Sequence, residues 1–256
     1  MGKNKKNTQQ LKPIVDPLNF KLTNATCKNE AQRELVRCIM KHEITFITGP
    51  AGTGKSYVGL MTALKLLKDR DNPYKKIVLI YPVELNQEEN LGYLKGTLED
   101  KLEPYTEVDL YTMEKIIGPD GPEVLNRLKQ EGLLEVRTAA FLRGATLDNS
   151  IVVISEAQNF SKETFLKILS RIGTDSKYIF NADEAQLDAT SIKKGRNIGG
   201  LRYAIEKLRE LPEIGVLEFS LSDVVRNPII GKILKLWDPD RYGDSDEINK
   251  DDNNDT

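Results

Sequence analysis

The residues best suited to chemistry lie in one short stretch that begins at Gly49 and ends at Ser56. This stretch fits the pattern G-x-x-x-x-G-K-[ST], whose backbone N–H groups surround the phosphates of a nucleotide. Gly52 and Gly54 allow the backbone to curl so that successive N–H groups point into one concavity. Lys55 is expected to reach the β- and γ-phosphates, and the Ser56 hydroxyl is expected to be a ligand of Mg²⁺. The predicted nucleotide-binding residues are Gly49, Pro50, Ala51, Gly52, Thr53, Gly54, Lys55 and Ser56.

Phosphate binding by this loop requires a strand before it and a helix after it. The run from Ile44 to Thr48 is apolar and β-branched, and residues 57–68 carry apolar side chains at helical spacing. The N-terminus of that helix would add partial positive charge beside the phosphates. A chance glycine-rich turn is the alternative, but it would not require these flanking elements. The sequence therefore predicts a protein that binds a nucleoside triphosphate.

Polar side chains follow two later strand-like runs, and phosphoryl chemistry needs a metal ligand and a group that positions water. The run from Ile151 to Ile154 ends in Ser155 and Glu156. Glu156 suits a general base, because the carboxyl ends of parallel strands face the phosphate loop. A surface glutamate at a strand end is the alternative. Asp183 and Gln186 follow the next predicted strand and are candidates for sensing the γ-phosphate or holding metal-bound water.

Apolar runs alternate with helical spacings along the rest of the chain, which indicates a parallel sheet with helices on both faces. We therefore predict a three-layer α/β fold with a mainly parallel sheet, formed by one domain over residues 29–237. The other predicted strands are residues 77–81, 133–140, 151–154, 177–180 and 216–220. The predicted helices are residues 29–41, 57–68, 161–172, 201–211 and 228–236, and residues 84–132 are predicted to be turn-rich with short helical pieces.

The composition is that of a folded domain with two differently charged ends. Of 256 residues, 39% are hydrophobic and 30% are charged, and the net charge is −2. We expect residues 1–28 to form a basic, partly flexible arm and residues 238–256 to form an acidic, disordered tail. No apolar run approaches the ~20 residues of a membrane helix, and the first residues lack an apolar signal core. We therefore expect a cytoplasmic protein without a membrane partner. With two cysteines and one histidine, neither a disulfide framework nor a zinc site is supported.

Several motifs together make the chain similar to the PhoH family of P-loop ATPases, whose core resembles the RecA-like motor domain of superfamily 1 helicases. Besides the phosphate loop, these motifs are Leu91-Gly92-Tyr93-Leu94 with Gly96, Phe141-Leu142-Arg143-Gly144, Glu156-Ala157-Gln158-Asn159, Arg171-Ile172-Gly173, Asp183 with Gln186, and Asp223-Val224-Val225-Arg226. The resemblance implies ATP and Mg²⁺ as cofactors and a hexamer as the homo-oligomer. It also places Gln32 where a glutamine of the family reads adenine, and a side-chain amide can pair with an adenine edge.

The chain departs from the family pattern at three places. The family's Asp-Glu pair is here Ser155-Glu156, its Arg-Pro is Tyr81-Pro82, and its Leu-Pro-Gly is Leu94-Lys95-Gly96. A serine lacks the charge that holds Mg²⁺ or its waters, and losing one charge-assisted contact costs about 1.5–3 kcal/mol. The predicted metal-side residues are Ser56, Ser155 and Asp183, and Asp183 is the candidate to compensate for the missing charge. On this reasoning, Ser155→Asp is expected to speed ATP hydrolysis and to tighten the Mg²⁺ requirement.

Helicase-like motors close ATP between two core domains, and the second domain supplies an arginine to the γ-phosphate. A chain of 256 residues lacks room for two such domains, so we expect a neighbouring subunit of a closed ring to supply the arginine. Arg226 is the first candidate and Arg171 the second. A structural ion pair between Arg226 and Asp223 is the alternative.

Three functions from different classes remain open at this stage. The first is ATP-driven remodelling or unwinding of RNA or single-stranded nucleic acid, for which aromatic side chains suited to stacking are scarce. The second is an ATP-gated binding or assembly module that turns over slowly because of Ser155. The third is a small-molecule kinase, for which no arginine-rich lid is visible. The candidate nucleic-acid contacts are Arg143, Lys193, Lys194, Arg196, Tyr93, Phe141 and Tyr203.

Overall fold

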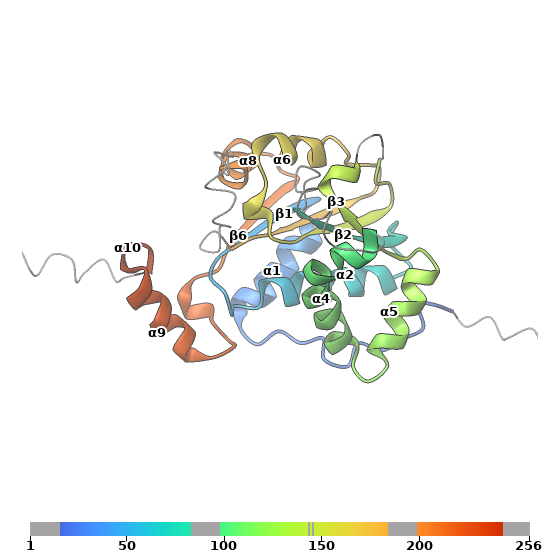
Figure 1. Cartoon of the computed structure of the whole chain (residues 1–256), viewed down its shortest axis with the longest axis horizontal. Coiled ribbons are helices and arrows are strands. Elements are labelled where there is room, and N and C mark those ends of the chain that lie inside the picture. Colours follow the sequence, from blue (N-terminus) through green and yellow to red (C-terminus); the bar gives the residue numbers. More distant parts are fainter. Residues whose placement is uncertain (1–15, 83–97, 143, 145, 184–198, 243–256) are drawn as a thin grey trace, which may run out of the picture.

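The protein is built around a six-stranded parallel sheet with helices on both faces (Figure 1). The computed structural model describes residues 16–82, 98–142, 144, 146–183 and 199–242. The strands are β1 (Ile44–Thr48), β2 (Lys76–Tyr81), β3 (Leu134–Thr138), β4 (Ser150–Ile154), β5 (Lys177–Asn181) and β6 (Ile214–Glu218). Their order is β3-β2-β4-β5-β1-β6, and every pair is parallel. The predicted three-layer α/β fold is therefore confirmed.

Two apolar cores lie on the two faces of the sheet. Because successive side chains of a strand point to opposite faces, Leu79 packs into one core and Ile80 into the other. The first core lies under α1 (Glu30–Lys41), α2 (Lys55–Lys68), α4 (Leu98–Ile117) and α5 (Gly121–Gln130). The second lies under α6 (Lys162–Leu169) and α8 (Gly200–Leu208), at the top of Figure 1. Burial on both faces explains why the central strands β1, β2, β4 and β5 have continuous apolar sequences.

Side-chain caps fix the start of three helices close to the predicted positions. The Asn29 side chain accepts a hydrogen bond from the Gln32 N–H at 2.9 Å, and Ser161 accepts one from the Thr164 N–H at 3.2 Å. Asn227 caps α9 (Pro228–Trp237) in the same way. These side chains satisfy N–H groups that have no partner within the first turn of a helix.

The interpretation of residues 84–132 is wrong in part. Residues 98–117 form α4, a single helix of 20 residues, where the sequence predicts turns and short helical pieces. Pro104 lies inside this helix and ordinarily disfavours helical structure. The last turns nevertheless bury Met113, Ile116 and Ile117 in the first core. Tertiary packing therefore outweighs the local signal.

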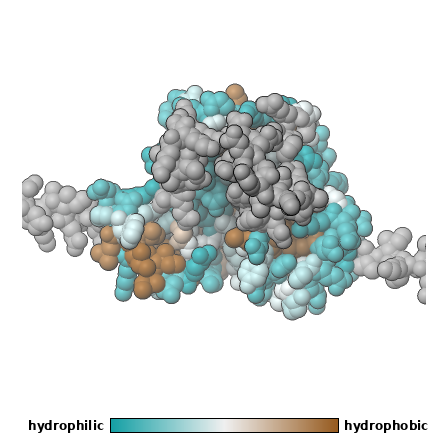
Figure 2. Space-filling view, in the orientation of Figure 1, coloured by the Kyte–Doolittle hydropathy of each residue, from teal (hydrophilic) through white to brown (hydrophobic). Residues whose placement is uncertain are grey.

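The two ends of the domain differ in how they meet the core. Phe20, within the predicted basic arm, is buried in the first core, and the Lys68 ammonium donates to the backbone carbonyl of Leu18 at 3.1 Å. At the other end, α9 and α10 (Pro239–Tyr242) extend away from the sheet (Figure 1), so helical structure continues past the predicted start of the acidic tail. Figure 2 shows apolar side chains gathered over α9, whose exposed members are Ile229, Ile233, Leu236 and Trp237. None of the described helices is long and apolar enough to cross a membrane.

Candidate functional site

The phosphate loop connects the end of β1 to the start of α2, as predicted. Its glycines adopt positive φ angles of 129° at Gly49, 85° at Gly52 and 87° at Gly54. Residues with a Cβ atom rarely adopt this backbone conformation. A Cβ atom on Gly49 would lie 2.5 Å from the Phe219 carbonyl oxygen, and one on Gly54 would lie 2.6 Å from Gln32 Nε2. The loop is thus clamped between the end of β6 and α1, which fixes the curl that phosphate binding needs.

Lys55 lies folded against the loop it belongs to. Its ammonium donates to the carbonyl oxygens of Gly49 at 2.6 Å and Pro50 at 2.7 Å, and the residue is only 7% exposed. Burial lowers the pKa of Lys55 to about 8, while the charges of Asp183 and Glu156 act in the opposite direction. Both predicted carboxylates therefore exert their field on the phosphate-binding lysine.

Ser56 is held by a residue that the sequence analysis left without a role. Asn181, the last residue of β5, donates from Nδ2 to the Ser56 hydroxyl at 2.5 Å. Its other amide atom, Oδ1, is buried and has no hydrogen-bond partner among the described residues. A buried acceptor without a partner is costly in a folded protein, and a water on a bound Mg²⁺ would satisfy it. Its position at a strand end beside the phosphate-loop strand is the signal that could have identified it.

Glu156 lies just past β4, two strands away from the phosphate loop in the sheet. It adopts a left-handed backbone with φ of 55° and is exposed. The buried Gln158 donates from Nε2 to Glu156 Oε2 at 2.6 Å, and its Oε1 accepts from the Asp183 N–H at 3.1 Å. Gln158 therefore ties the predicted base to the end of β5. A non-glycine residue in this backbone region is uncommon and often marks a functional site.

Ser155 has two polar neighbours that the sequence could not identify. Its hydroxyl donates to Asp109 Oδ2 of α4 at 2.5 Å, and the Tyr81 hydroxyl donates to the same oxygen at 2.8 Å. Burial raises the pKa of Asp109, and the hydrogen bonds from Ser155 and Tyr81 oppose this shift. A carboxylate from α4 thus stands beside the serine that occupies the acidic position of the family pattern.

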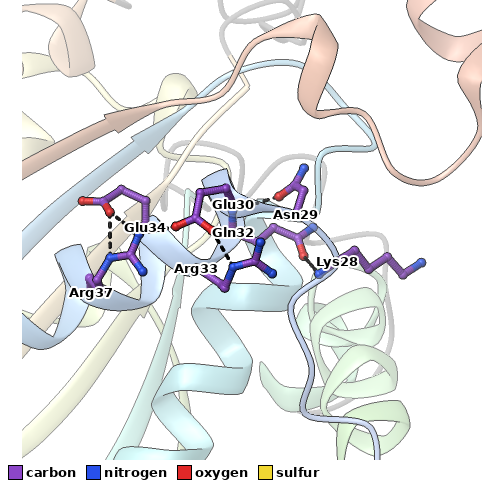
Figure 3. Close-up of polar contacts among 7 residues, drawn as sticks. All are labelled: Lys28, Asn29, Glu30, Gln32, Arg33, Glu34 and Arg37. Carbon is purple, nitrogen blue, oxygen red and sulfur yellow. Dashed lines mark hydrogen bonds and ion pairs between the residues drawn. The ribbon is translucent and has the colours of Figure 1, made fainter.

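Gln32, the residue predicted to read adenine, contacts both the phosphate loop and the segment before α1, and Figure 3 shows its bond to Lys28. Its Nε2 donates to the Thr53 carbonyl at 2.8 Å, and its Oε1 accepts from the Lys28 N–H at 2.7 Å. A cavity of about 460 Å³ opens beside it, lined also by Tyr57, Val225 and Arg226. Both polar atoms of the amide are thus bonded within the protein and the residue is only 2% exposed, so adenine recognition by Gln32 stays a prediction. An exposed ion-pair network runs along α1 on both sides of Gln32 in the sequence, formed by Glu30, Arg33, Glu34 and Arg37 (Figure 3).

The two candidate arginines lie at opposite edges of the sheet. The Arg226 N–H donates to the Gly52 carbonyl at 3.1 Å, and the residue lines the cavity next to Gln32, so it lies against the loop of its own chain. Arg226 could therefore act on a nucleotide bound to its own chain, and its supply from a neighbouring subunit stays a prediction. The Arg171 carbonyl accepts from Tyr178 near the start of β5, at the edge away from the loop. The role of Arg171 as an arginine supplied to another copy stays a prediction.

Several predicted contacts cannot be placed. Outside the described residues lie the predicted site residue Gln186, the candidate contacts Tyr93, Arg143, Lys193, Lys194 and Arg196, and also Lys95, which departs from the family pattern. Tyr203 of α8 is described and is 44% exposed, with the Lys162 and Lys207 ammonium groups 4.1 and 5.7 Å from its ring centre. This group combines an aromatic face with positive charge.

The described residues fit Mg²⁺ and a nucleoside triphosphate. The loop offers N–H groups and a lysine, and the metal side offers the Ser56 hydroxyl and Asn181 Oδ1, which has no partner in the described part of the chain. Oxygen atoms of this kind suit Mg²⁺, which prefers oxygen ligands and retains several waters.

Comparison with known proteins places this site in a family. The family model described as "PhoH-like protein" matches residues 24–238. A PhoH-like protein of Bacillus subtilis (strain 168) is 35% identical over 220 residues, which cover 86% of this chain and 66% of the relative. A PhoH-like protein of Synechocystis is 31% identical over 211 residues, which cover 82% of this chain and 61% of the relative. The chain thus spans less than two thirds of either relative. Among solved structures, the large terminase of a thermophilic bacteriophage aligns with a TM-score of 0.48 and 11% identity, over 82% of this chain and 50% of the terminase.

Proposed function

Because the chain belongs to the PhoH-like protein family, we propose that it is an ATPase that couples Mg²⁺–ATP hydrolysis to remodelling of RNA or single-stranded nucleic acid. The observation that carries the proposal is the placement of Glu156. Gln158 holds it beside the end of β5, and its charge acts on Lys55 at the phosphate loop. A phosphate grip and a carboxylate base therefore share one edge of the sheet, as hydrolysis of a phosphoanhydride requires.

Each residue has a distinct task in this reaction. The loop N–H groups and Lys55 bind the triphosphate and counter the negative charge that develops on it. Glu156 orients a water molecule and accepts its proton. Ser56, oriented by Asn181, would be the protein ligand of Mg²⁺, and Ser155 and Asp183 are the other residues proposed for the metal side. When bound, Mg²⁺ supplies charge neutralisation at the β- and γ-phosphates.

A surface formed by α6 and α8 supports the nucleic-acid part of the proposal. Tyr203 presents an exposed ring flanked by Lys162 and Lys207. An aromatic ring can stack on a base while the two ammonium groups contact phosphates. Lys193, Lys194 and Arg196, which lie outside the described part of the chain, remain candidate phosphate contacts in the same proposal.

Assembly into a ring, which the family resemblance gives as a hexamer, completes the proposal. It is supported by α9, whose exposed Leu236 and Trp237 extend an apolar face away from the domain (Figure 2). Such a face is stabilised when a second copy covers it. Mass photometry of the wild type and of Leu236→Lys tests this point. A ring that persists unchanged in the variant would remove α9 from the interface.

The decisive experiment is the steady-state ATPase rate with and without single-stranded RNA, with Lys55→Ala as the reference lacking the phosphate grip. We expect hydrolysis that RNA stimulates and that Lys55→Ala abolishes. Slow hydrolysis indifferent to RNA would favour an ATP-gated assembly module, which the uncharged Ser155 makes the second candidate. Transfer of phosphate to a small acceptor would instead identify a kinase. An unaltered rate in Lys55→Ala would overturn the ATPase proposal.

A further inference from the structure

Asp109 is a buried carboxylate that has no role in the hydrolysis mechanism proposed above. The pairing of Ile80 with Ile154 continues at the strand ends, so Tyr81 and Ser155 lie next to each other. Both hydroxyls donate to one oxygen of Asp109, and Asp109 is only 5% exposed. This carboxylate comes from α4, far from Ser155 in sequence, and is buried at the point where two strands end at the site.

The end of β4 lies next to the end of β5, where Asn181 contacts Ser56. Ile154 pairs with Phe180, so Ser155 is followed across the sheet by Asn181. Val153 and Ile179 point into the core under α2, and by alternation Ser155 and Asn181 face the same way. Asn181 in turn binds Ser56 and leaves its Oδ1 without a partner among the described residues. Asp109, Ser155, Asn181 and Ser56 therefore form one polar row.

Phosphoryl-transfer sites of the P-loop class place an aspartate near the metal at this strand end. Building on the ATPase function proposed above, we propose that Asp109 is a positioning residue that supplies this missing negative charge through the Ser155 hydroxyl. Because Ser155 donates its hydrogen to Asp109, its oxygen lone pairs stay available for Mg²⁺ or a metal-bound water. A hydrogen bond to a carboxylate also raises the basicity of the group that donates it, as outer partners of metal ligands do.

This assignment differs from the compensation expected of Asp183. Asp183 follows β5, contacts Gln158 through its backbone N–H, and its charge acts on Lys55. Asp109 instead contacts the very residue that lacks the charge. The negative charge of the family's aspartate is then carried by Asp109, one hydrogen bond away from Ser155.

The test measures how much Mg²⁺ tightens ATP binding, which needs no hydrolysis. The dissociation constant of a fluorescent ATP analogue is measured with Mg²⁺ and with EDTA, and the ratio of the two is compared between variants. In Asp109→Asn, which keeps the shape and removes the charge, the ratio is expected to fall about tenfold, as for other outer partners of metal ligands. Binding in EDTA is expected to stay within about twofold of the wild type, because the phosphate grip is untouched.

Two further variants separate positioning from mere packing. Ser155→Ala keeps Asp109 and removes the hydroxyl that transmits its charge, so it is expected to lower the Mg²⁺ ratio as Asp109→Asn does. Tyr81→Phe removes a hydrogen bond to the same oxygen but keeps both the carboxylate and the Ser155 hydroxyl. It is expected to lower the melting temperature while keeping the Mg²⁺ ratio. If Asp109→Asn also lowers only the melting temperature, Asp109 is a structural residue and the inference is wrong.

A charge swap sharpens the result. Ser155→Asp alone places two carboxylates in contact, which disfavours ionisation of one of them, so it is expected to destabilise the fold without raising the Mg²⁺ ratio. The double variant Ser155→Asp/Asp109→Asn keeps one negative charge and is expected to restore the ratio. This reverses the gain expected for Ser155→Asp from sequence alone. Wild type that binds no better than Lys55→Ala would overturn the ATPase proposal itself, whereas a normal wild type with an unaltered Asp109→Asn ratio overturns only the role of Asp109.

Discussion

The two sides of the nucleotide site are built in different ways. The proposed phosphate-binding side consists of eight consecutive residues, Gly49 to Ser56, which run from the end of β1 into the first turn of α2. The acidic side is assembled from separate elements, because Glu156 follows β4, Asn181 ends β5 and Asp109 belongs to α4. A grip for phosphate can be encoded in one turn, since successive backbone N–H groups make it. A base and a metal ligand need side chains that approach from several directions, so this side depends on the fold.

The largest expected effect lies on the acidic side. Glu156→Gln removes the proposed base but keeps its size, so turnover is expected to fall about 10²–10⁴-fold, the usual contribution of general base catalysis. ATP affinity should change little, because the phosphate loop is intact. Single-turnover hydrolysis and equilibrium binding, measured on the same preparation, check both statements. Equal losses in rate and in affinity would place Glu156 in binding instead of in proton transfer.

On the loop side, a substitution at Gly49 should act through stability. Gly49→Ala places a Cβ atom 2.5 Å from the Phe219 carbonyl at a φ of 129°, so the loop must shift or strain. We expect a loss of at least about 2 kcal/mol in the free energy of unfolding, together with loss of ATP binding. Gly132→Ala is the matched control, because its φ is also positive but nothing lies within 4 Å of the added atom. Equal losses in urea unfolding would mean that backbone strain alone, not the clamp by Phe219, explains the effect.

The pH dependence of ATP binding should report Lys55 directly. Burial lowers the pKa of Lys55 to about 8, and a bound triphosphate favours its charged form. Above about pH 8, binding must therefore recover a proton that the free lysine has lost. ATP affinity is expected to fall by up to about tenfold for each further pH unit. Titration calorimetry between about pH 7 and about pH 9.5 measures this, and the Lys55→Met variant should lack the trend. An affinity equally dependent on pH in that variant would assign the effect to another group.

The smallest effect concerns the link between the two strand ends on the acidic side. Gln158→Leu keeps the buried volume but removes the bridge between Glu156 and the Asp183 N–H. Loss of orientation without loss of the base is expected to slow turnover about tenfold. The change in turnover is measured as the rate at saturating ATP, and the melting temperature serves as the control for packing. A rate as low as that of Glu156→Gln would show that Gln158 contributes more to hydrolysis than the orientation of Glu156.

Much of the fold follows from local patterns. The apolar runs predict the four central strands, β1, β2, β4 and β5, because these are buried on both faces, while the edge strands β3 and β6 are partly exposed. The caps Asn29, Ser161 and Asn227 mark the starts of their helices. Local patterns do not predict α4, because Pro104 and frequent charged residues interrupt its helical pattern. Packing against α2 and α5 stabilises this helix. Asp109 lies on this helix, so the residue that meets Ser155 could not be anticipated.

The sequence alone determined the phosphate loop, the alternation of strands and helices, and the acidic residue after β4, because these depend on neighbours along the chain. Only the tertiary structure decided that β5 lies between β1 and β4, that Gln158 bridges to Asp183, and that Asp109 contacts both Tyr81 and Ser155. The reason is that strand order and helix packing set which side chains meet across the sheet. Hydrogen bonds between distant residues leave no periodicity in the chain from which they could be read.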